Sequence, residues 1–459
     1  MRYLALCTDY DGTLATDGRV LPDTLSALER LLASGRRLVL VTGRELDELQ
    51  AVCPRLDLFE YVVAENGALL YKPSTGEETP LAARPPDSFV STLLQRGVGP
   101  ISVGRVIVAT WEPHETTVLS TIRDLGLELQ VIFNKGAVMI LPAGVNKATG
   151  LSHALEKMEL SPHNAVAIGD AENDHALLAS CECSAAVSNA LPTLKNAADI
   201  VTTADHGAGV VELIEEMLRD DLASREPKLT RHHILLGTDD RGAEVRLPPQ
   251  GETVLLVGAR DSGKSEAAAD LMERLAQKRY TFCAIDVEGD QGTVAHAVAL
   301  GSPSRPPTAN EIVKLFRGAD ESGVINLVGL SGSDRVPFLQ ELAPKFTELR
   351  EHLGRPHCVL HITTRPGLVA GEVLRATTLF IALGTTAQAL LEEFCQASGI
   401  TPPATKLSAG SREGTALAWR PEDANAQPGM GQPFRLNIAS PQNESGREAK
   451  TLQSGVRHR

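Results

Sequence analysis

Short apolar runs alternate with longer helix-like stretches through about the first 220 residues. The stretches 23–34 and 171–179 are typical of helices. The strand-like runs are residues 4–7, 37–41, 61–64 and 165–168. This strand–helix alternation predicts a parallel sheet covered by helices on both faces, and therefore an α/β domain over residues 1–218.

The pattern changes between about residue 80 and residue 144. Strand-like runs at 105–109 and 129–133 flank a helix-like stretch near 117–125. We therefore expect a small α+β insert within the first domain.

Three further segments follow. Residues 219–233 are polar and contain a proline, which indicates a linker. A second strand–helix series begins with the apolar run 253–257 and predicts another α/β domain over residues 234–420. Residues 421–459 are rich in Pro, Gly, Gln, Asn and Ser, which predicts a poorly ordered tail.

Composition narrows the class of protein. A chain of 459 residues is too long for one ordinary domain, and its 42% of hydrophobic residues suffices for buried cores. No apolar run of about 18 residues occurs, so we expect no membrane span and a cytoplasmic protein. The net charge of -14 argues against a large nucleic-acid surface. The seven scattered cysteines are expected to be buried free thiols.

Two acids follow the first strand-like run. Asp9 and Asp11 stand two residues apart directly after residues 4–7, and Gly12 permits a sharp turn behind them. Open parallel sheets bind ligands at the carboxyl ends of their strands. The pair therefore indicates a catalytic site, although a surface turn with two solvated acids would show the same pattern.

Other strand-like runs also end in polar residues. Together these residues supply a hydroxyl, cations and two more acids to one edge of the predicted sheet, as metal-assisted phosphoryl transfer requires. They are Thr42, Gly43, Arg44, Lys147, Asp170 and Asp174.

These motifs resemble those of the haloacid dehalogenase superfamily. They are D-x-D-G-T at residues 9–13, T-G-R at 42–44, Lys147, and G-D-x-x-N-D at 169–174. The insert lies between the second and third motifs, as in the Cof-type or IIB branch, which includes sugar-phosphate phosphatases. The segment 64–68 also resembles that branch. The resemblance implies a Rossmann-like core with an α+β cap.

The resemblance implies a role for each motif. Asp9 would attack phosphorus, and Asp11 would protonate the leaving group and then activate water. Thr42 and Lys147 would hold the phosphoryl oxygens. The remaining implied residues are Gly43, Arg44 and Asn66 for phosphate or substrate. For Mg²⁺ the resemblance implies Asp9, Asp170 and the backbone carbonyl of Asp11 as ligands, with Asp174 supporting the metal shell.

The cap implies a small phosphorylated metabolite as the substrate. A sugar phosphate, phosphoglycolate and another small phosphate ester remain open alternatives. Trp111, Glu112, His114 and Glu115 either face the cleft or form a solvated turn, and we expect the turn.

A second motif follows the run 253–257. Its sequence, G-x-x-x-x-G-K-S, precedes a strong helix former and is typical of a P-loop that binds ATP with Mg²⁺. Its glycines let backbone N–H groups face phosphates, its lysine reaches the outer phosphates, and its serine binds the metal. The residues concerned are Gly258, Gly263, Lys264 and Ser265.

Residues 232–420 resemble the HerA and FtsK group of hexameric translocase ATPases, which implies a P-loop NTPase fold and a possible homo-oligomer. Where that group places two acids on its Walker B strand, this chain has His361 and Ile362. The departure implies slow hydrolysis, with Asp286 and Glu288 as the nearby acids that would substitute.

The patterns together predict a capped phosphatase fused to a nucleotide-binding module. An ATP-driven motor, with the phosphatase as an accessory domain, is the alternative, and an oligomerising scaffold is a third. The catalytic set is complete in the first domain and incomplete in the second, which favours the phosphatase.

Overall fold

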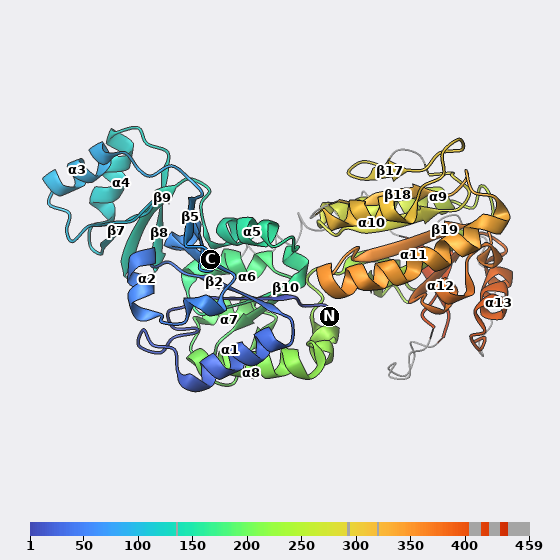
Figure 1. Ribbon diagram of the computed structural model, residues 1–459, viewed down its shortest axis with the longest axis horizontal. Coiled ribbons are helices and arrows are strands. Elements are labelled where there is room, and N and C mark those ends of the chain that lie inside the picture. The colour runs from blue at the N-terminus through green and yellow to red at the C-terminus, as the bar shows by residue number, and fades with distance from the viewer. Residues whose placement is uncertain (135, 292–293, 319–320, 404–414, 422–431, 439–459) are drawn as a thin grey trace. The chain divides into compact units, whose positions relative to one another are not determined.

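A computed structural model shows that the chain forms two compact units, Met1–Leu229 and Thr230–Arg459 (Figure 1). The structure describes residues 1–134, 136–291, 294–318, 321–403, 415–421 and 432–438. Among these residues, no helix has the length and apolar character needed to cross a membrane.

The first unit is built on an eight-stranded sheet in the order β12-β11-β10-β1-β2-β3-β4-β5. The pairs from β12 to β3 are parallel, and β4 and β5 join antiparallel at one edge. The strands are β1 (Ala5–Thr8), β2 (Arg37–Val41), β3 (Tyr61–Ala64), β4 (Leu69–Lys72), β5 (Glu77–Pro80), β10 (Ala165–Gly169), β11 (Cys183–Ala186) and β12 (Ile200–Val201).

Helices cover both faces of this sheet, with α1 and α8 on one face and α5 on the other (Figure 1). The central strands are therefore buried on both faces, which explains their continuous apolar sequences. The helices are α1 (Pro22–Ala33), α2 (Leu46–Val52), α5 (Lys147–Lys157), α6 (His175–Ser180), α7 (Pro192–Ala197) and α8 (His206–Asp220).

The register of the central strands brings their carboxyl ends to one edge. Thr8 of β1 is paired with Leu40 of β2 and with Ile168 of β10. The polar residues that follow these three strands consequently start from the same level of the sheet.

A smaller layer is inserted between β5 and α5. It contains an antiparallel sheet in the order β6-β7-β9-β8 and two helices that share an apolar core with it. The elements are α3 (Asp87–Gln95), β6 (Ser102–Val103), β7 (Val108–Trp111), α4 (Glu115–Asp124), β8 (Leu129–Asn134) and β9 (Ala137–Pro142). We call this insert the cap.

The second unit contains a ten-stranded sheet in the order β14-β13-β22-β21-β20-β15-β19-β16-β18-β17. The strands from β20 to β17 run parallel, and the other four join antiparallel. The strands are β13 (Ile234–Thr238), β14 (Glu244–Leu247), β15 (Glu252–Gly258), β16 (Phe282–Asp286), β17 (Val298–Leu300), β18 (Gly323–Asn326), β19 (Cys358–Thr363), β20 (Leu379–Leu383), β21 (Thr415–Trp419) and β22 (Phe434–Ile438).

The helices of the second unit pack on two apolar clusters. They are α9 (Lys264–Gln277), α10 (Ala309–Arg317), α11 (Gly332–Leu353), α12 (Gly371–Arg375) and α13 (Ala387–Ser398).

Two segments differ from simple linker and tail expectations. The stretch 219–233 holds the end of α8 and a 3₁₀-helix at Ala223–Lys228. The expectation of a poorly ordered tail does not hold for β22, because β22 pairs with β21 and β13 and buries Leu436. Residues 422–431 and 439–459 of the expected tail lie outside the described residues.

Candidate active site

Lys147 bridges two buried carboxylates at the carboxyl edge of the first sheet. Its Nζ lies 2.5 Å from Asp9 Oδ1 and 2.6 Å from Asp174 Oδ1. Asp9 directly follows β1, and Lys147 is the first residue of α5. The side chain of Asn146 caps that helix by accepting hydrogen bonds from Ala148 and Thr149, which fixes where Lys147 emerges.

The charges in this cluster depend on one another. Burial raises the pKa of Asp9, and the nearby Asp174 raises it further, while Lys147 lowers it; the net result is a pKa of about 7. Burial opposes the charge of Lys147, but Asp174 and Asp9 outweigh it and raise the pKa of the ammonium above its ordinary value. The lysine is thus a fixed cation between two acids.

Three carboxylates offer oxygen atoms close enough together to hold a cation. One oxygen each from Asp9, Asp170 and Asp174 lies within 4.8 Å of the others. Asp174 Oδ2 accepts hydrogen bonds from the backbone N–H groups of Asp170 and Ala171, both at 3.0 Å. Asp174 therefore braces the loop that carries Asp170, and the carboxylate oxygens of this group are of the kind that hard cations prefer.

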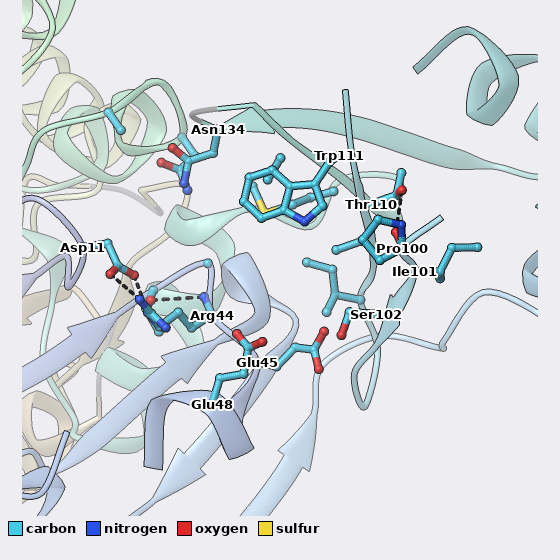
Figure 2. Close-up of a pocket in the computed structure, with 18 of the residues that line it drawn as sticks. Asp11, Arg44, Glu45, Glu48, Pro100, Ile101, Ser102, Thr110, Trp111 and Asn134 are labelled. Carbon is cyan, nitrogen blue, oxygen red and sulfur yellow. Dashed lines mark hydrogen bonds and ion pairs between the residues drawn. The ribbon is translucent and has the colours of Figure 1, made fainter. Parts of the chain in front are cut away.

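The Asp11 side chain lies outside this three-carboxylate group. Arg44 donates to both of its oxygens, from Nε at 2.6 Å and from Nη2 at 2.7 Å (Figure 2). The backbone N–H of Arg44 donates to Thr42 Oγ1 at 3.2 Å. Thr42 itself is buried, and Gly43 is the residue between Thr42 and Arg44.

A cavity of about 540 Å³ separates these residues from the cap. From the sheet edge, Asp9, Asp11, Thr42, Gly43 and Arg44 line it. From the cap, the lining includes Ser102, Trp111, Asn134 and Met139. Figure 2 shows the indole of Trp111 across the cavity from Arg44 and Glu45.

The position of Trp111 corrects the expectation that it belongs to a solvated turn. It ends β7 and lines the cavity. Glu112, His114 and Glu115 are not among the described lining residues. Glu112 and His114 lie between β7 and α4, whereas Glu115 is the first residue of α4 and so differs from the expected turn.

Asn66 lies behind the cavity wall. It is buried, it adopts a left-handed backbone with φ 55°, and its Oδ1 accepts a hydrogen bond from Asn173 at 3.0 Å. Asn173 lines the cavity, whereas Asn66 is not among the described lining residues. The structure thus brings Asn66 close to the site but places another side chain in front of it.

Glu65 is a buried carboxylate that the sequence analysis did not identify. Its Oε1 accepts a hydrogen bond from the backbone N–H of Arg105 at 2.8 Å. Its Oε2 accepts from Val106 at 2.7 Å and from Ile107 at 2.9 Å. A core side chain thus holds the segment that leads into β7. The sequence signal was an acid in the apolar stretch after β3.

Glu45 and Glu48 were also missed. Both lie at the start of α2 and line the cavity. Acids are common in the first turn of any helix because they complement its dipole, so their sequence positions gave no functional signal.

The four residues of the G-x-x-x-x-G-K-S motif lie at the end of β15 and the start of α9 in the second unit. Gly258 ends the strand, Gly263 has a left-handed backbone with φ 82°, and Lys264 and Ser265 begin α9. Lys264 is 3% exposed. β15 lies between β19 and β20, and all three strands are parallel.

Comparison with known proteins addresses the first unit. A family model for haloacid dehalogenase-like hydrolases matches residues 6–104 and 106–214. A phosphoglycolate phosphatase from Methanothermobacter thermautotrophicus is 30% identical over 223 residues, covering 47% of this chain and 98% of the relative. Phosphoglycolate phosphatase 2 from Saccharolobus solfataricus is also 30% identical over 223 residues, covering 47% of this chain and 92% of the relative.

Among solved structures, a haloacid dehalogenase-like hydrolase from Bacteroides thetaiotaomicron matches with a TM-score of 0.43 and 20% identity, covering 47% of this chain and 99% of its own. The sequence matches show that the chain belongs to the haloacid dehalogenase-like hydrolases through its N-terminal unit. It is an enzyme, a phosphoric monoester hydrolase.

Proposed function

We propose that the first unit is a Mg²⁺-dependent phosphatase that hydrolyses a small phosphate monoester through an aspartyl phosphate on Asp9. One observation carries the proposal. Asp9, Lys147 and the Asp170 loop converge at one sheet edge, beneath a cavity roofed by the cap. Carboxylate oxygens in such a cluster suit Mg²⁺, with Asp9 and Asp170 as ligands and Asp174 as a brace.

Each residue then has a definite task. A carboxylate oxygen of Asp9 bonds to phosphorus while the ester P–O bond breaks, and Asp11 gives its proton to the leaving oxygen. Asp11 then takes a proton from water, whose oxygen bonds to phosphorus and releases inorganic phosphate from Asp9. Lys147 and Thr42 hold the phosphoryl oxygens. The metal, when bound, offsets negative charge on the phosphoryl group.

The cap and the cavity support a small substrate. A volume of about 540 Å³ is typical of a small-molecule pocket and too small for a folded protein chain. The relatives named above are phosphoglycolate phosphatases, which supports a small ester. The indole of Trp111 and the amide of Asn134 suit a hydroxylated leaving group such as a sugar. We therefore propose a sugar phosphate or a similar metabolite.

The test is a panel of small phosphate esters, assayed with Mg²⁺ and with chelator. Wild-type protein should release phosphate only with Mg²⁺, and Asp9→Asn should fall to background because the nucleophile is lost. Asp57→Asn, an exposed acid of the same unit, serves as the matched control. If Asp9→Asn hydrolysed these esters as fast as wild type, the nucleophile assignment would be wrong.

For the second unit we propose a site for ATP with Mg²⁺ at Gly258–Ser265. The support is the strand–loop–helix arrangement, the left-handed Gly263 and the buried Lys264 at the start of α9. His361 and Ile362 are buried side chains of β19 and supply no carboxylate, which supports slow hydrolysis. A rapid motor is correspondingly disfavoured.

ATP affinity can be measured in Asp9→Asn protein, so that the phosphatase does not consume the nucleotide. Lys264→Ala should weaken binding strongly, and Lys314→Ala, an exposed lysine of α10, should not. Equal binding by both variants would refute the P-loop assignment.

A further inference from the structure

The carboxyl end of β19 carries two hydroxyl residues, Thr363 and Thr364, directly after His361 and Ile362. A carboxylate from elsewhere lies against both of them. Glu288 Oε1 accepts hydrogen bonds from Thr363 Oγ1 at 3.0 Å, from Thr364 N at 2.7 Å and from Thr364 Oγ1 at 2.8 Å. The end of β19 therefore has an acid beside it, although the strand itself contributes none.

Glu288 arrives from the neighbouring strand. β16 is parallel to β19, with Asp286 opposite Ile362, and Glu288 stands two residues beyond the end of β16. The backbone N–H of Val287 donates to the carbonyl of Ile362 at 3.2 Å, which extends the pairing. The main chain thus carries Glu288 past the level of His361 and Ile362, to the point where its carboxylate meets Thr363 and Thr364 at the carboxyl end of β19.

Asp286 does not fill this role. Its Oδ1 accepts hydrogen bonds from the backbone N–H groups of Glu288 and Gly289, at 3.2 and 2.9 Å. Its Oδ2 accepts from Gln291 N at 2.7 Å. Both oxygens therefore serve to close the loop, which leaves Glu288 as the acid that the loop presents.

The second oxygen of Glu288 faces the P-loop. Glu288 Oε2 lies 3.5 Å from Lys264 Nζ, and Asp290 Oδ2 lies 3.8 Å from the same nitrogen. Both distances exceed the roughly 2.7–2.9 Å that is usual for a hydrogen bond between an ammonium group and a carboxylate. Glu288 Oε2 and the buried ammonium of Lys264 are therefore held only by a long contact, in contrast to the three shorter hydrogen bonds that Oε1 accepts.

We propose that Glu288 completes the Mg²⁺–nucleotide site in place of the missing β19 acids, held in position by Thr363 and Thr364. This inference rests on the proposed nucleotide site. P-loop sites hold Mg²⁺ with the P-loop hydroxyl, here Ser265, and with an acid from a neighbouring strand. Glu288 Oε2 is the oxygen placed for that second task, and Oε1 is the anchor.

The test compares ATP binding by calorimetry with MgCl₂ and with EDTA, in full-length Asp9→Asn protein. Mg²⁺ should strengthen ATP binding in this parent protein. Glu288→Gln should reduce that gain about 10- to 100-fold, as loss of a carboxylate from a metal shell does. Binding in EDTA should stay equal or tighten, because a negative charge near the phosphates is removed.

Two variants separate this role from simple bracing. Asp290→Asn removes the other loop acid near Lys264 and should leave most of the Mg²⁺ gain. Thr364→Val keeps the carboxylate but removes one of its anchors, and should lower the gain partly. A fully retained gain in Glu288→Gln, or an equal loss of binding with and without Mg²⁺, would overturn the proposal.

The parent protein decides the underlying proposal separately. If it bound no ATP under either condition, the nucleotide site itself would be refuted, and this inference with it. If it bound ATP with a Mg²⁺ gain that depended on Asp290 alone, only the assignment to Glu288 would fail.

Discussion

The guanidinium of Arg44 holds both carboxylate oxygens of Asp11, at 2.6 and 2.7 Å. The hydrogen bonding to Asp11 is the main cause of a raised pKa for Arg44, so this side chain is a permanent cation at the cavity wall. A phosphate ester entering the cavity meets an arginine that is already paired. In the proposed mechanism, binding would exchange part of this pair for contacts with the substrate and would free Asp11 to act on the leaving group.

Arg44→Gln should lower kcat/KM roughly 10- to 100-fold, mainly through KM, because a charge-assisted hydrogen bond contributes about 1.5–3 kcal/mol. Steady-state kinetics on the best ester of the panel measure the effect. Arg55→Gln, which removes a more exposed arginine paired with Asp57 and Glu29, is the control. An unchanged KM in Arg44→Gln would show that Arg44 does not meet the substrate.

Glu65→Gln should loosen the attachment of the cap. In the wild-type protein, three backbone N–H groups donate to the two carboxylate oxygens of Glu65. A glutamine has only one acceptor oxygen, and its NH₂ group would place a donor against one or more of these N–H donors. We expect faster hydrogen exchange at residues 105–107 and a higher KM, because the segment leads into β7 and Trp111.

Glu78→Gln is the matched control for this change. Glu78 also contacts Arg105, at 3.0 Å, but through the arginine side chain and at the surface. Equal exchange rates in both variants would mean that the buried carboxylate does not anchor the cap.

Gly67→Ala should damage the site from a distance. Gly67 has φ 103°, and a Cβ built there would lie 1.9 Å from the carbonyl oxygen of Asn146. Asn146 is the residue whose side chain accepts hydrogen bonds at the N-terminus of α5. The start of α5, and with it Lys147, would have to move. We expect a loss of stability of about 1–3 kcal/mol or more together with a large fall in kcat.

Gly76→Ala isolates the backbone contribution. Gly76 also has a positive φ, at 71°, but a Cβ there would meet no atom within 4 Å. It should therefore lose some stability and keep its kcat. A normal kcat in Gly67→Ala would show that α5 accommodates the methyl group without moving Lys147.

The part of the site that follows from local pattern could be predicted from the sequence. Asp9, Thr42 and Asp170 each follow an apolar run, and parallel pairing alone requires that such residues meet at one edge. The central strands β1, β2 and β10 were predicted for the same reason, since burial on both faces leaves continuous apolar sequences. The family comparison supports the phosphatase that these residues indicated.

The remainder depends on contacts between distant segments, which a local pattern does not reveal. Glu65 accepts hydrogen bonds from backbone groups some 40 positions away in the sequence. Asp174 accepts hydrogen bonds from Lys147 and from two backbone N–H groups. β22 was assigned to a tail because its neighbours are polar, yet it is held by pairing with β13 and β21. Trp111 gave no periodic signal that distinguished a cavity wall from a turn.

The last prediction concerns Lys147 as the cation that balances the acids when no metal is bound. Lys147→Met keeps the length of the side chain but leaves Asp9 and Asp174 without their shared partner. Breaking a buried pair in this way costs about 3–5 kcal/mol. In chelator, the unfolding transition of the first unit should fall by roughly 10 °C. Mg²⁺ should then raise that transition more in Lys147→Met than in wild type, because it supplies the missing positive charge to Asp9 and Asp170.

The unfolding transition of the first unit is identified as the one that Mg²⁺ shifts in the absence of nucleotide. Lys157→Met, at the other end of α5 and exposed, should behave as wild type. Equal Mg²⁺ shifts in wild type and in Lys147→Met would contradict this account of the charge balance.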